Sequence, residues 1–480
     1  MPNALRAIAL LAIAIPIFGF NDEDKIHPSF DLVAIHPDTF SPRVSAMDFL
    51  TDGRLALSTW RPNEVFLFSG IDGPRSKIKA TKIAAGFKDI MGLKVVSDTI
   101  FLVDQEHLWA LADTNKDGIY ETRLRIADIP YSGGFHEWSF GLAYADGHFF
   151  TGLSVAASQT GVTLSPQKDV HRGAVISIDR LGRIATVATG FRAPEGLCLG
   201  PDGELFATDN QGTWLPASKL IHVRPGRTYG HRIEPNIPQQ EGYPFPPAVW
   251  LPYGDVTRSP TEPAYAKSGP YAGQMFYGDI AMGVLRRVFL EKVKGEYQGC
   301  VFRFSGGFEA AVHRLSIGSD GSIYAGCLGN GDIQDWGWAG RLSGLQRLRP
   351  NGKPVFEIHA VHARKDGFEI EFSRPIKFAG LDSTRFSAER WWYEPTAAYG
   401  GSKKDVTSLR IRDVTRTADG TKVSLRIDGL LPQQVIHVQT KGIRSEDGQT
   451  VWTPEFWYTL NFIPDEGLND NRINHIDNKP

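Results

Sequence analysis

The sequence has few cysteines and no excess of charge of either sign. Its 480 residues contain three cysteines, Cys198, Cys300 and Cys327, each in an apolar stretch (GLCLG, QGCVF and YAGCLG). Apolar surroundings predict small core residues rather than a disulfide framework, and the absence of a CxxCH motif argues against covalent haem. With 52 basic and 54 acidic residues the net charge is -2, so no broad basic surface for nucleic acid is expected. A small neutral molecule or a glycan is the better candidate partner.

Long hydrophobic runs are also lacking, apart from one at the N-terminus. Arg6 precedes an apolar run over residues 7–20, and an acidic polar stretch follows at residues 21–24. This order is typical of a signal peptide, which we place at residues 1–20. The run is short for a membrane span and contains Pro16. We therefore expect a secreted or periplasmic protein that does not span the membrane after cleavage.

A short repeat runs through the first 350 residues. A turn, usually Asp-Gly, is followed by an alternating strand at TDGRLALST, SDTIFLVD, ADGHFFTGL, PDGELFATD, AGQMFYGD and SDGSIYAGC, which begin at Thr51, Ser97, Ala145, Pro201, Ala272 and Ser319. Asp-Gly supplies the positive φ angles of a tight hairpin, and most spacings match one four-stranded blade. Six copies predict a six-bladed β-propeller over residues 27–352. The Pro-rich residues 235–263 are expected to form an irregular excursion over one face.

The pattern changes after about residue 355. Longer alternating strands, such as those around Phe368, Val423 and Tyr458, are separated by Asp-Gly turns. Alternation of this kind suits sheets with one solvated face, so we predict a C-terminal β-sandwich over residues 355–463. The polar residues 464–480 are expected to form a tail. The predicted fold class is therefore all-β, a six-bladed β-propeller followed by a C-terminal β-sandwich.

The richest polar stretch lies at residues 190–212, GFRAPEGLCLGPDGELFATDNQG, and continues through residues 218–231, SKLIHVRPGRTYGH. In order and spacing it resembles the soluble quinoprotein glucose and sorbosone dehydrogenase family, in which an Arg-x-Pro-x-Gly-Leu segment, a Pro-Asp-Gly strand, a polar turn ending in Gln-Gly and a Gly-Gly-x-Tyr-Gly element follow one another. The resemblance covers residues 40–350. Within it, the chain looks most similar to a secreted, dehydrogenase-like branch that is often described as membrane-bound or haem-associated.

The resemblance implies a site and its cofactors. His136 matches the general base of sugar oxidation, and Arg192 matches the arginine that contacts pyrroloquinoline quinone. The carbonyls of Gly212 and Thr213 match the catalytic calcium position. Because the quinone carries three carboxylates, further cations are expected, and Arg341 and Arg347 are the candidates. The polar turn Asp209, Asn210 and Gln211 is a separate candidate for contact with the cofactor. The implied partners are a sugar and an electron acceptor such as a cytochrome.

Two departures from the family pattern bear on this hypothesis. Glu195 stands where the family has glutamine, which places an acidic group beside an anionic cofactor. The acidic run that holds extra calcium in the family is here the segment Leu-Pro-Ala-Ser-Lys, residues 215–219. Structural roles also remain open: His136 can cap a strand, Arg192 can form a salt bridge with Glu195 or Asp209, and Trp336 and Trp338 can pack in a blade instead of forming a sugar platform.

A separate motif indicates calcium. Asp113, Asn115 and Asp117 are followed by Gly118 and Glu121, the D-x-N-x-D-G-x-x-E spacing that wraps oxygen ligands round the ion, with the carbonyl of Ile119 contributing. Position twelve of an EF-hand loop would be a leucine, so the motif is not an EF-hand. We expect a structural ion in a propeller hairpin, against the alternative of an empty turn.

Three function hypotheses follow. The first is a quinone- and calcium-dependent sugar dehydrogenase with His136 as general base and Arg192 at the quinone. The second is a non-redox glycan hydrolase or lyase in which His136, Glu195 and Asp209 act as acid and base. The third is a propeller that binds glycans or proteins. Fold alone does not choose among them, because one architecture hosts many functions.

Overall fold

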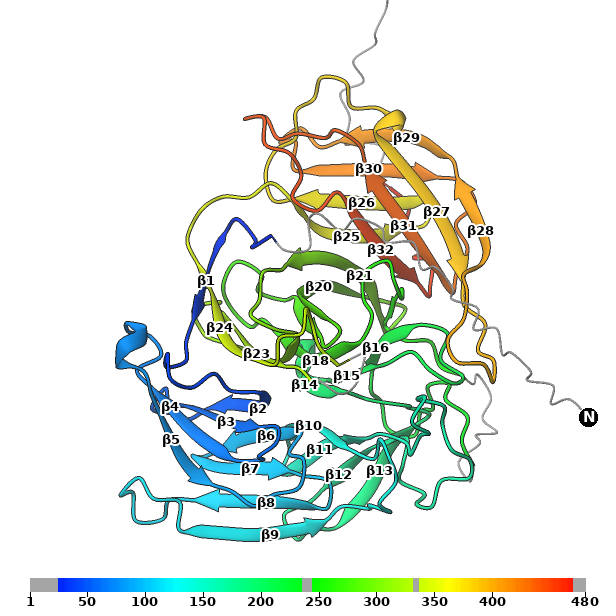
Figure 1. The fold of residues 1–480 in the computed structure, drawn as a ribbon. Coiled ribbons are helices and arrows are strands. Elements are labelled where there is room, and N and C mark those ends of the chain that lie inside the picture. Colours follow the sequence, from blue (N-terminus) through cyan, green and yellow to red (C-terminus); the bar gives the residue numbers. More distant parts are fainter. Residues whose placement is uncertain (1–24, 235–243, 331–335, 469–480) are drawn as a thin grey trace, which may run out of the picture.

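The computed structural model describes residues 25–234, 244–330 and 336–468. It confirms the all-β fold class: a propeller of six four-stranded sheets is followed by a C-terminal β-sandwich (Figure 1). The predicted signal peptide at residues 1–20 and most of the predicted tail lie outside the described residues. Within the described ranges, no helix is long and apolar enough to cross a membrane.

Each blade is an antiparallel sheet, and in blades 1 to 5 the strands follow chain order. Blade 1 contains β2 (Val44–Phe49), β3 (Leu55–Thr59), β4 (Val65–Ser69) and β5 (Lys79–Ala84), with the short helix η1 (Arg75–Lys77) before β5. Blade 2 contains β6 (Gly92–Val96), β7 (Thr99–Val103), β8 (His107–Ala112) and β9 (Thr122–Asp128). Blade 3 contains β10 (Ser139–Ala145), β11 (His148–Leu153), β12 (Ala174–Ile178) and β13 (Ile184–Thr189).

The other blades differ at their outer edges. Blade 4 contains β14 (Gly196–Leu199), η2 (Pro201–Gly203), β15 (Leu205–Asp209), β16 (Ser218–His222) and β17 (Val249–Leu251). Blade 5 contains β18 (Pro260–Tyr265), β19 (Met275–Asp279), β20 (Met282–Val293) and β21 (Glu296–Ser305). Blade 6 contains β22 (Val312–Ile317), β23 (Ile323–Leu328) and β24 (Ser343–Pro350), and the N-terminal strand β1 (Phe30–Ala34) pairs with β24 to complete it. The two ends of the propeller are thereby joined by backbone hydrogen bonds.

All six sequence repeats encode the same element, the hairpin turn and the second strand of a blade (β3, β7, β11, β15, β19 and β23). In the turn before β11, Asp146 and Gly147 have φ angles of 49° and 79°, the left-handed pair that a two-residue hairpin needs. The copy at Ala272 has Gly273 at φ 86° in its turn. The predicted excursion over residues 235–263 is partly wrong, because it contains β17 and the start of β18; residues 235–243 lie outside the described part.

The first strands of the blades (β2, β6, β10, β14, β18 and β22) contact one another around the central channel. Arg314 of β22 is fully buried there and donates hydrogen bonds to the carbonyls of Ser45, Met91 and Glu195 at 2.6–2.7 Å. Ser45 lies in blade 1, and Met91 and Glu195 directly precede the first strands of blades 2 and 4. A single guanidinium therefore satisfies buried backbone acceptors from three parts of the propeller.

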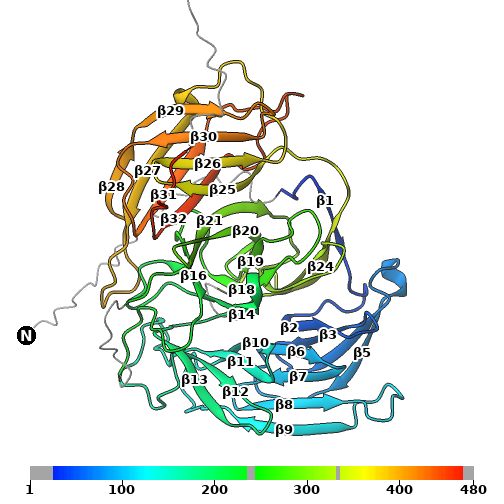
Figure 2. The same ribbon diagram turned by 180° about the vertical axis from the view of Figure 1, so that it is seen from behind.

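One sheet of the sandwich extends the sheet of blade 5. Its first sheet has the order β25 (Ile358–Arg364), β26 (Gly367–Phe372), β30 (Lys422–Ile427) and β29 (Ile411–Arg416). Its second has β32 (Glu455–Leu460), β31 (Gln434–Thr440), β27 (Phe386–Trp392) and β28 (Lys404–Leu409), with η3 (Ser383–Arg385) before β27. Because β32 pairs with β21, blade 5 and this sheet form one eight-stranded sheet, which both views of the ribbon show (Figures 1 and 2).

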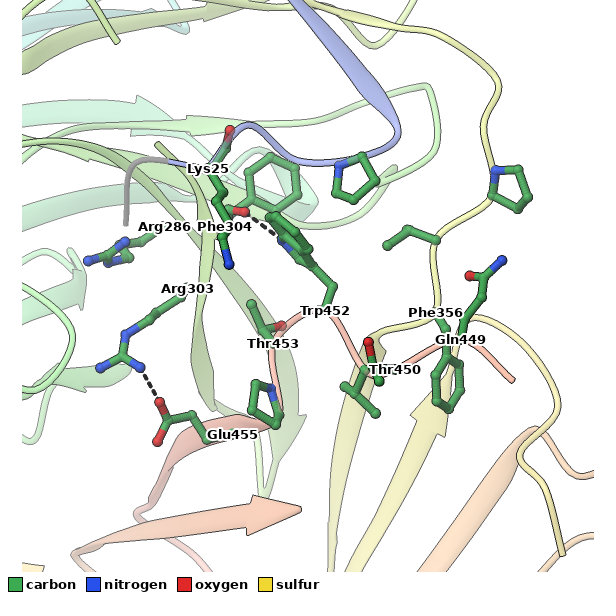
Figure 3. A pocket seen from close by; sticks show the side chains of 16 residues that line it. Lys25, Arg286, Arg303, Phe304, Phe356, Gln449, Thr450, Trp452, Thr453 and Glu455 are labelled. Atoms are coloured by element: carbon green, nitrogen blue, oxygen red, sulfur yellow. Dashed lines mark hydrogen bonds and ion pairs between the residues drawn. The ribbon is translucent and has the colours of Figure 1, made fainter. Parts of the chain in front are cut away.

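A cavity of about 440 Å³ lies at this junction (Figure 3). Trp452 donates its indole N–H to the carbonyl of Phe304 at 2.9 Å, and Arg303 forms an ion pair with Glu455. These contacts join β21 to the segment that leads into β32, so the sandwich is held to the propeller by side chains as well as by the shared sheet.

The three cysteines are free. Cys300 and Cys327 are buried within strands, and Cys198 is partly buried in β14. Burial raises the pKa of the Cys198 and Cys327 thiols, which keeps them in the unreactive protonated form. The expectation of small core residues is met by this arrangement.

Candidate functional site

A cavity of about 520 Å³ lies at the end of the channel where the inner strands begin. His136 and Trp138 directly precede β10, Arg192 and Glu195 precede β14, and Ser259 precedes β18. The described lining is completed by Phe135, Gln159, Thr160, Gly161, Asn210, Gln211, Tyr253, Arg258, Ala281, Trp336 and Tyr399. Because the inner strands run in the same direction round the channel, loops distant in sequence meet at one opening.

His136 is held in one orientation by its neighbours. Its backbone has a φ of 73°, and its Nδ1 lies 3.2 Å from the carbonyl oxygen of Val155. A carbonyl accepts only, so Nδ1 carries the hydrogen and the lone pair of Nε2 is the basic position. Burial, followed by the charge of Arg192, lowers the pKa of His136 to about 3. The imidazole is therefore neutral at physiological pH and can accept a hydrogen bond or a proton.

Arg192 is buried and extends across the cavity. Its Nη2 donates to the carbonyl of Gly161 at 2.9 Å, and its guanidinium carbon lies 5.1 Å from the ring centre of Tyr399. A Cβ on Gly212 would lie 2.1 Å from the Arg192 side chain, so the arginine can adopt this position only because residue 212 is a glycine. Within the described residues, Arg192 forms no ion pair and its Nε has no hydrogen-bond partner. The alternative role considered for Arg192, a salt bridge with Glu195 or Asp209, is therefore not found in the described part of the chain.

Asp209 holds the backbone of the turn that carries Arg192. Its carboxylate accepts the backbone N–H of Arg192 at 3.1 Å and that of Ala193 at 2.8 Å, and it does not line the cavity. Burial raises the pKa of Asp209 to about 6, against the lowering effect of Lys219 and the two amides. This carboxylate fixes the turn that carries Arg192 and has little freedom to contact a ligand.

Glu195 is buried in the cavity wall with 1% of its surface exposed. Burial raises the pKa of Glu195 to about 8, although Arg314 and Arg192 favour the charged form. The carboxyl is thus largely protonated at neutral pH, and its Oε2 is buried without a hydrogen-bond partner among the described residues. The expectation that Glu195 adds negative charge beside an anionic ligand is wrong at neutral pH, because the sequence does not show the desolvation that keeps the proton on.

At the predicted calcium position, the backbone of Gly212 and Thr213 pairs with other parts of the chain. The carbonyl oxygen of Gly212 accepts N–H groups from Leu215 at 3.0 Å and from Gly400 at 2.9 Å, and Thr213 pairs with Tyr399 in a short β-bridge. A carbonyl has two lone pairs, and both of Gly212's are engaged. A calcium ion would have to displace one of these amides.

Two other predicted cations lie outside the cavity lining. Arg341 is exposed and lies two residues before β24. Arg347 of β24 forms ion pairs with Asp72 at 2.5 Å and Asp320 at 2.6 Å. Gln211, in contrast, lines the cavity and donates its amide to the carbonyl of Pro216 at 2.8 Å.

The Asp-rich hairpin lies between β8 and β9, on the outside of blade 2. Its oxygens face backbone amides: Asp113 accepts from Asp117 and Gly118, Asp117 accepts from Ile119, and Glu121 accepts from Thr114. Among the residues that the structure describes, no three His, Cys, Asp or Glu side chains gather closely enough to hold a metal ion. Calcium binding at this hairpin stays a prediction.

Sequence reasoning missed Arg258, Tyr253 and Tyr399. Arg258 could have been found from the repeat, since it lies two residues before the inner strand β18, much as Arg192 lies four residues before the inner strand of the preceding blade, β14. Tyr399 carries no such signal because it comes from the sandwich. Trp336, considered for a sugar platform, does line the cavity, and its ring centre lies 4.8 Å from that of Trp138.

No protein-family model matches the sequence, and no curated protein matches it. Solved structures do resemble it. A glucose dehydrogenase-type oxidoreductase from Thermus thermophilus is 17% identical with a TM-score of 0.51, and the match covers 66% of this chain and 99% of the other. The pyrroloquinoline quinone (PQQ)-bound aldose sugar dehydrogenase from Streptomyces coelicolor is 13% identical with a TM-score of 0.51, over 67% and 99% of the two chains. The holo PQQ domain of pyranose dehydrogenase from Coprinopsis cinerea is 10% identical with a TM-score of 0.50, over 68% and 96%. This chain therefore has the propeller fold of the soluble sugar dehydrogenases, as the resemblance in its sequence implies.

Proposed function

We propose that the channel-mouth cavity is the active site of a secreted or periplasmic, quinoprotein-type sugar dehydrogenase. The observation that carries the proposal is the joint presence of neutral His136, buried Arg192 and protonated Glu195 in one cavity. A base and a cation beside a neutral acid suit the removal of a hydroxyl proton next to an anionic cofactor.

The residues present fit pyrroloquinoline quinone. Arg192 and Arg258 bring two positive charges to the lining, and Glu195 is the only carboxyl group among its described residues. The Nε of Arg192, buried and without a partner among those residues, has a hydrogen to offer to a carboxylate. Trp138 and Trp336 supply apolar surface for a planar ring system. When bound, the quinone supplies a two-electron acceptor for hydride.

In this proposal His136 takes the proton of the sugar hydroxyl at Nε2. Its Nδ1–H bond to Val155 fixes that tautomer and orients the ring. Burial is the main cause of the low pKa of His136, and the charge of Arg192 is the second; an anionic group bound beside Arg192 would offset the second cause and raise the basicity of Nε2. A soluble acceptor such as a cytochrome would then collect the electrons.

Calcium does not fit the Gly212 carbonyl as it stands, because both of its lone pairs accept backbone amides. At the hairpin of Asp113, Asn115, Asp117 and Glu121 it would be a structural ion. Binding would require these oxygens to turn from the backbone amides toward a common centre.

The glycan hydrolase or lyase hypothesis has one observation in its favour, the protonated Glu195 as a proton donor. Within the described lining, Glu195 has no second carboxyl group to act with it, because Asp209 accepts hydrogen bonds from the backbone of Arg192 and Ala193 and does not line the cavity. Two carboxyl groups on opposite sides of the scissile bond are the usual requirement for glycoside hydrolysis. We therefore rank it below the dehydrogenase.

The test is quinone uptake followed by sugar oxidation. Purified protein is titrated with pyrroloquinoline quinone, with and without calcium, while absorbance and the fluorescence of the cavity tryptophans are followed; a sugar panel with an artificial electron acceptor is then supplied. Saturable, stoichiometric uptake and dye reduction are expected. Absence of uptake at micromolar quinone would refute the proposal, and release of reducing sugar without dye reduction would favour the hydrolase.

A further inference from the structure

The sandwich reaches the channel mouth through the segment between β27 and β28. Thr396 accepts the backbone N–H of Trp214 at 2.9 Å, Gly400 donates to Gly212 at 2.9 Å, and Gly401 donates to the carbonyl of Pro216 at 3.0 Å. Three backbone hydrogen bonds therefore fasten residues 396–401 to the loop after β15. We call this segment the sandwich loop.

The fit of the sandwich loop depends on glycine. Gly400 has a φ of 67°, and a Cβ there would lie 2.9 Å from the side-chain amide of Gln211, which itself lines the cavity. A side chain at this position would be strained and would push against Gln211. The close approach brings the preceding residue, Tyr399, to the rim of the cavity.

Tyr399 is half-exposed, with 50% of its surface accessible, yet it is fixed in place. Its backbone bridges to Thr213, and its ring lies over the guanidinium of Arg192 at 5.1 Å. The stacked arginine holds one part of the ring, while the exposed part stays available at the opening. A fixed aromatic surface at the mouth of a polar cavity is suited to the C–H face of a sugar ring.

We propose that Tyr399 is a sugar-binding residue, so that the C-terminal domain completes the substrate site. The substrate class is a pyranose whose ring packs against the exposed part of Tyr399 while a hydroxyl reaches into the cavity toward His136. The orientation of the sugar, with a hydroxyl toward His136, rests on the proposed function. Binding of the sugar at Tyr399 does not depend on any redox chemistry.

The experiment measures sugar binding by calorimetry to the protein without added quinone, using D-glucose, D-galactose, maltose and cellobiose. Tyr399→Ala is compared with Tyr399→Phe, which keeps the ring. Gly400→Ala displaces the loop without removing the tyrosine. Phe378→Ala is the matched control, because Phe378 is also an exposed sandwich aromatic stacked by an arginine, Arg416 at 4.6 Å, and lies outside the cavity.

Tyr399→Ala and Gly400→Ala are expected to weaken binding of the best sugar about tenfold, while Tyr399→Phe and Phe378→Ala stay within about twofold of the wild type. In parallel, phenylglyoxal labelling of Arg192, read by peptide mass spectrometry, is expected to accelerate in Tyr399→Ala, since the ring no longer covers the guanidinium. Equal sugar affinity in the wild type and Tyr399→Ala overturns the inference, as does a wild type that binds none of the four sugars. Sugar binding that depends on Tyr399 without quinone uptake overturns only the proposed dehydrogenase.

Discussion

Replacing Glu195 with glutamine removes a carboxyl group that the fold keeps protonated. Burial raises its pKa from 4.5 to about 8, so the native protein holds a proton that the unfolded chain loses above pH 4.5. The stability that depends on this group is fully present below about pH 4.5 and falls as the pH rises to 8. At about 1.4 kcal/mol per pKa unit, the burial cost is about 3 kcal/mol at pH 7 and about 4 kcal/mol at pH 8.

Glu195→Gln has nearly the shape of the protonated acid and cannot ionise. We expect it to equal the wild type in stability near pH 4.5 and to exceed it by about 3 kcal/mol at pH 7, because other buried acids such as Asp209 contribute equally to both proteins. Urea unfolding at pH 5, 6, 7 and 8 measures the difference. Glu204→Gln is the control, since Glu204 is 47% exposed at its side chain and lies outside the cavity.

The reasoning about Glu195 fails if the stability curves of the wild type and Glu195→Gln run parallel from pH 5 to 8. The same titration should appear in ligand binding. The affinity of the wild type for an anionic quinone is expected to fall above about pH 8, as Glu195 ionises beside the ligand, while that of Glu195→Gln stays flat. A wild-type affinity that is also flat would place the ligand away from Glu195.

Four further outcomes are expected. His136→Asn should lower kcat for sugar oxidation about 10²- to 10⁴-fold and leave quinone affinity within twofold, as stopped-flow and fluorescence titration can test; a normal kcat removes His136 from the chemistry. Arg192→Gln should weaken quinone binding about 10- to 100-fold, and unchanged binding would mean that the carboxylates lie elsewhere. Calcium at 1 mM should raise the unfolding temperature of the wild type but not that of Asp113→Asn, whereas equal shifts would contradict the hairpin site. Arg314→Met should cost at least about 3 kcal/mol in urea unfolding, because three buried carbonyls lose their donor; a cost below about 1 kcal/mol would show that they find other partners.

The architecture could be predicted because it depends on local chemistry. Asp-Gly and its substitutes take positive φ angles wherever they occur, and the alternating strand after each turn has one face to bury. The six copies therefore fall on one structural element, the second strand of each blade, and even the weak copy at Ala272 forms β19. The gathering of His136, Arg192 and Asn210 follows as well, since all three lie in loops at the ends of blade strands.

What the sequence could not supply are effects of burial and of contacts between distant residues. The proton on Glu195 depends on desolvation by surrounding blades, and the role of Asp209 depends on which amides it faces. The carbonyl of Gly212 matches a calcium ligand in sequence but is occupied by an amide 188 positions later in the chain, that of Gly400. Tyr399 enters the site only because β32 extends blade 5 and carries the sandwich to the channel mouth. Turn chemistry acts over a few residues and can be read from them, whereas charge state and the walls of a cavity are properties of the whole packed chain.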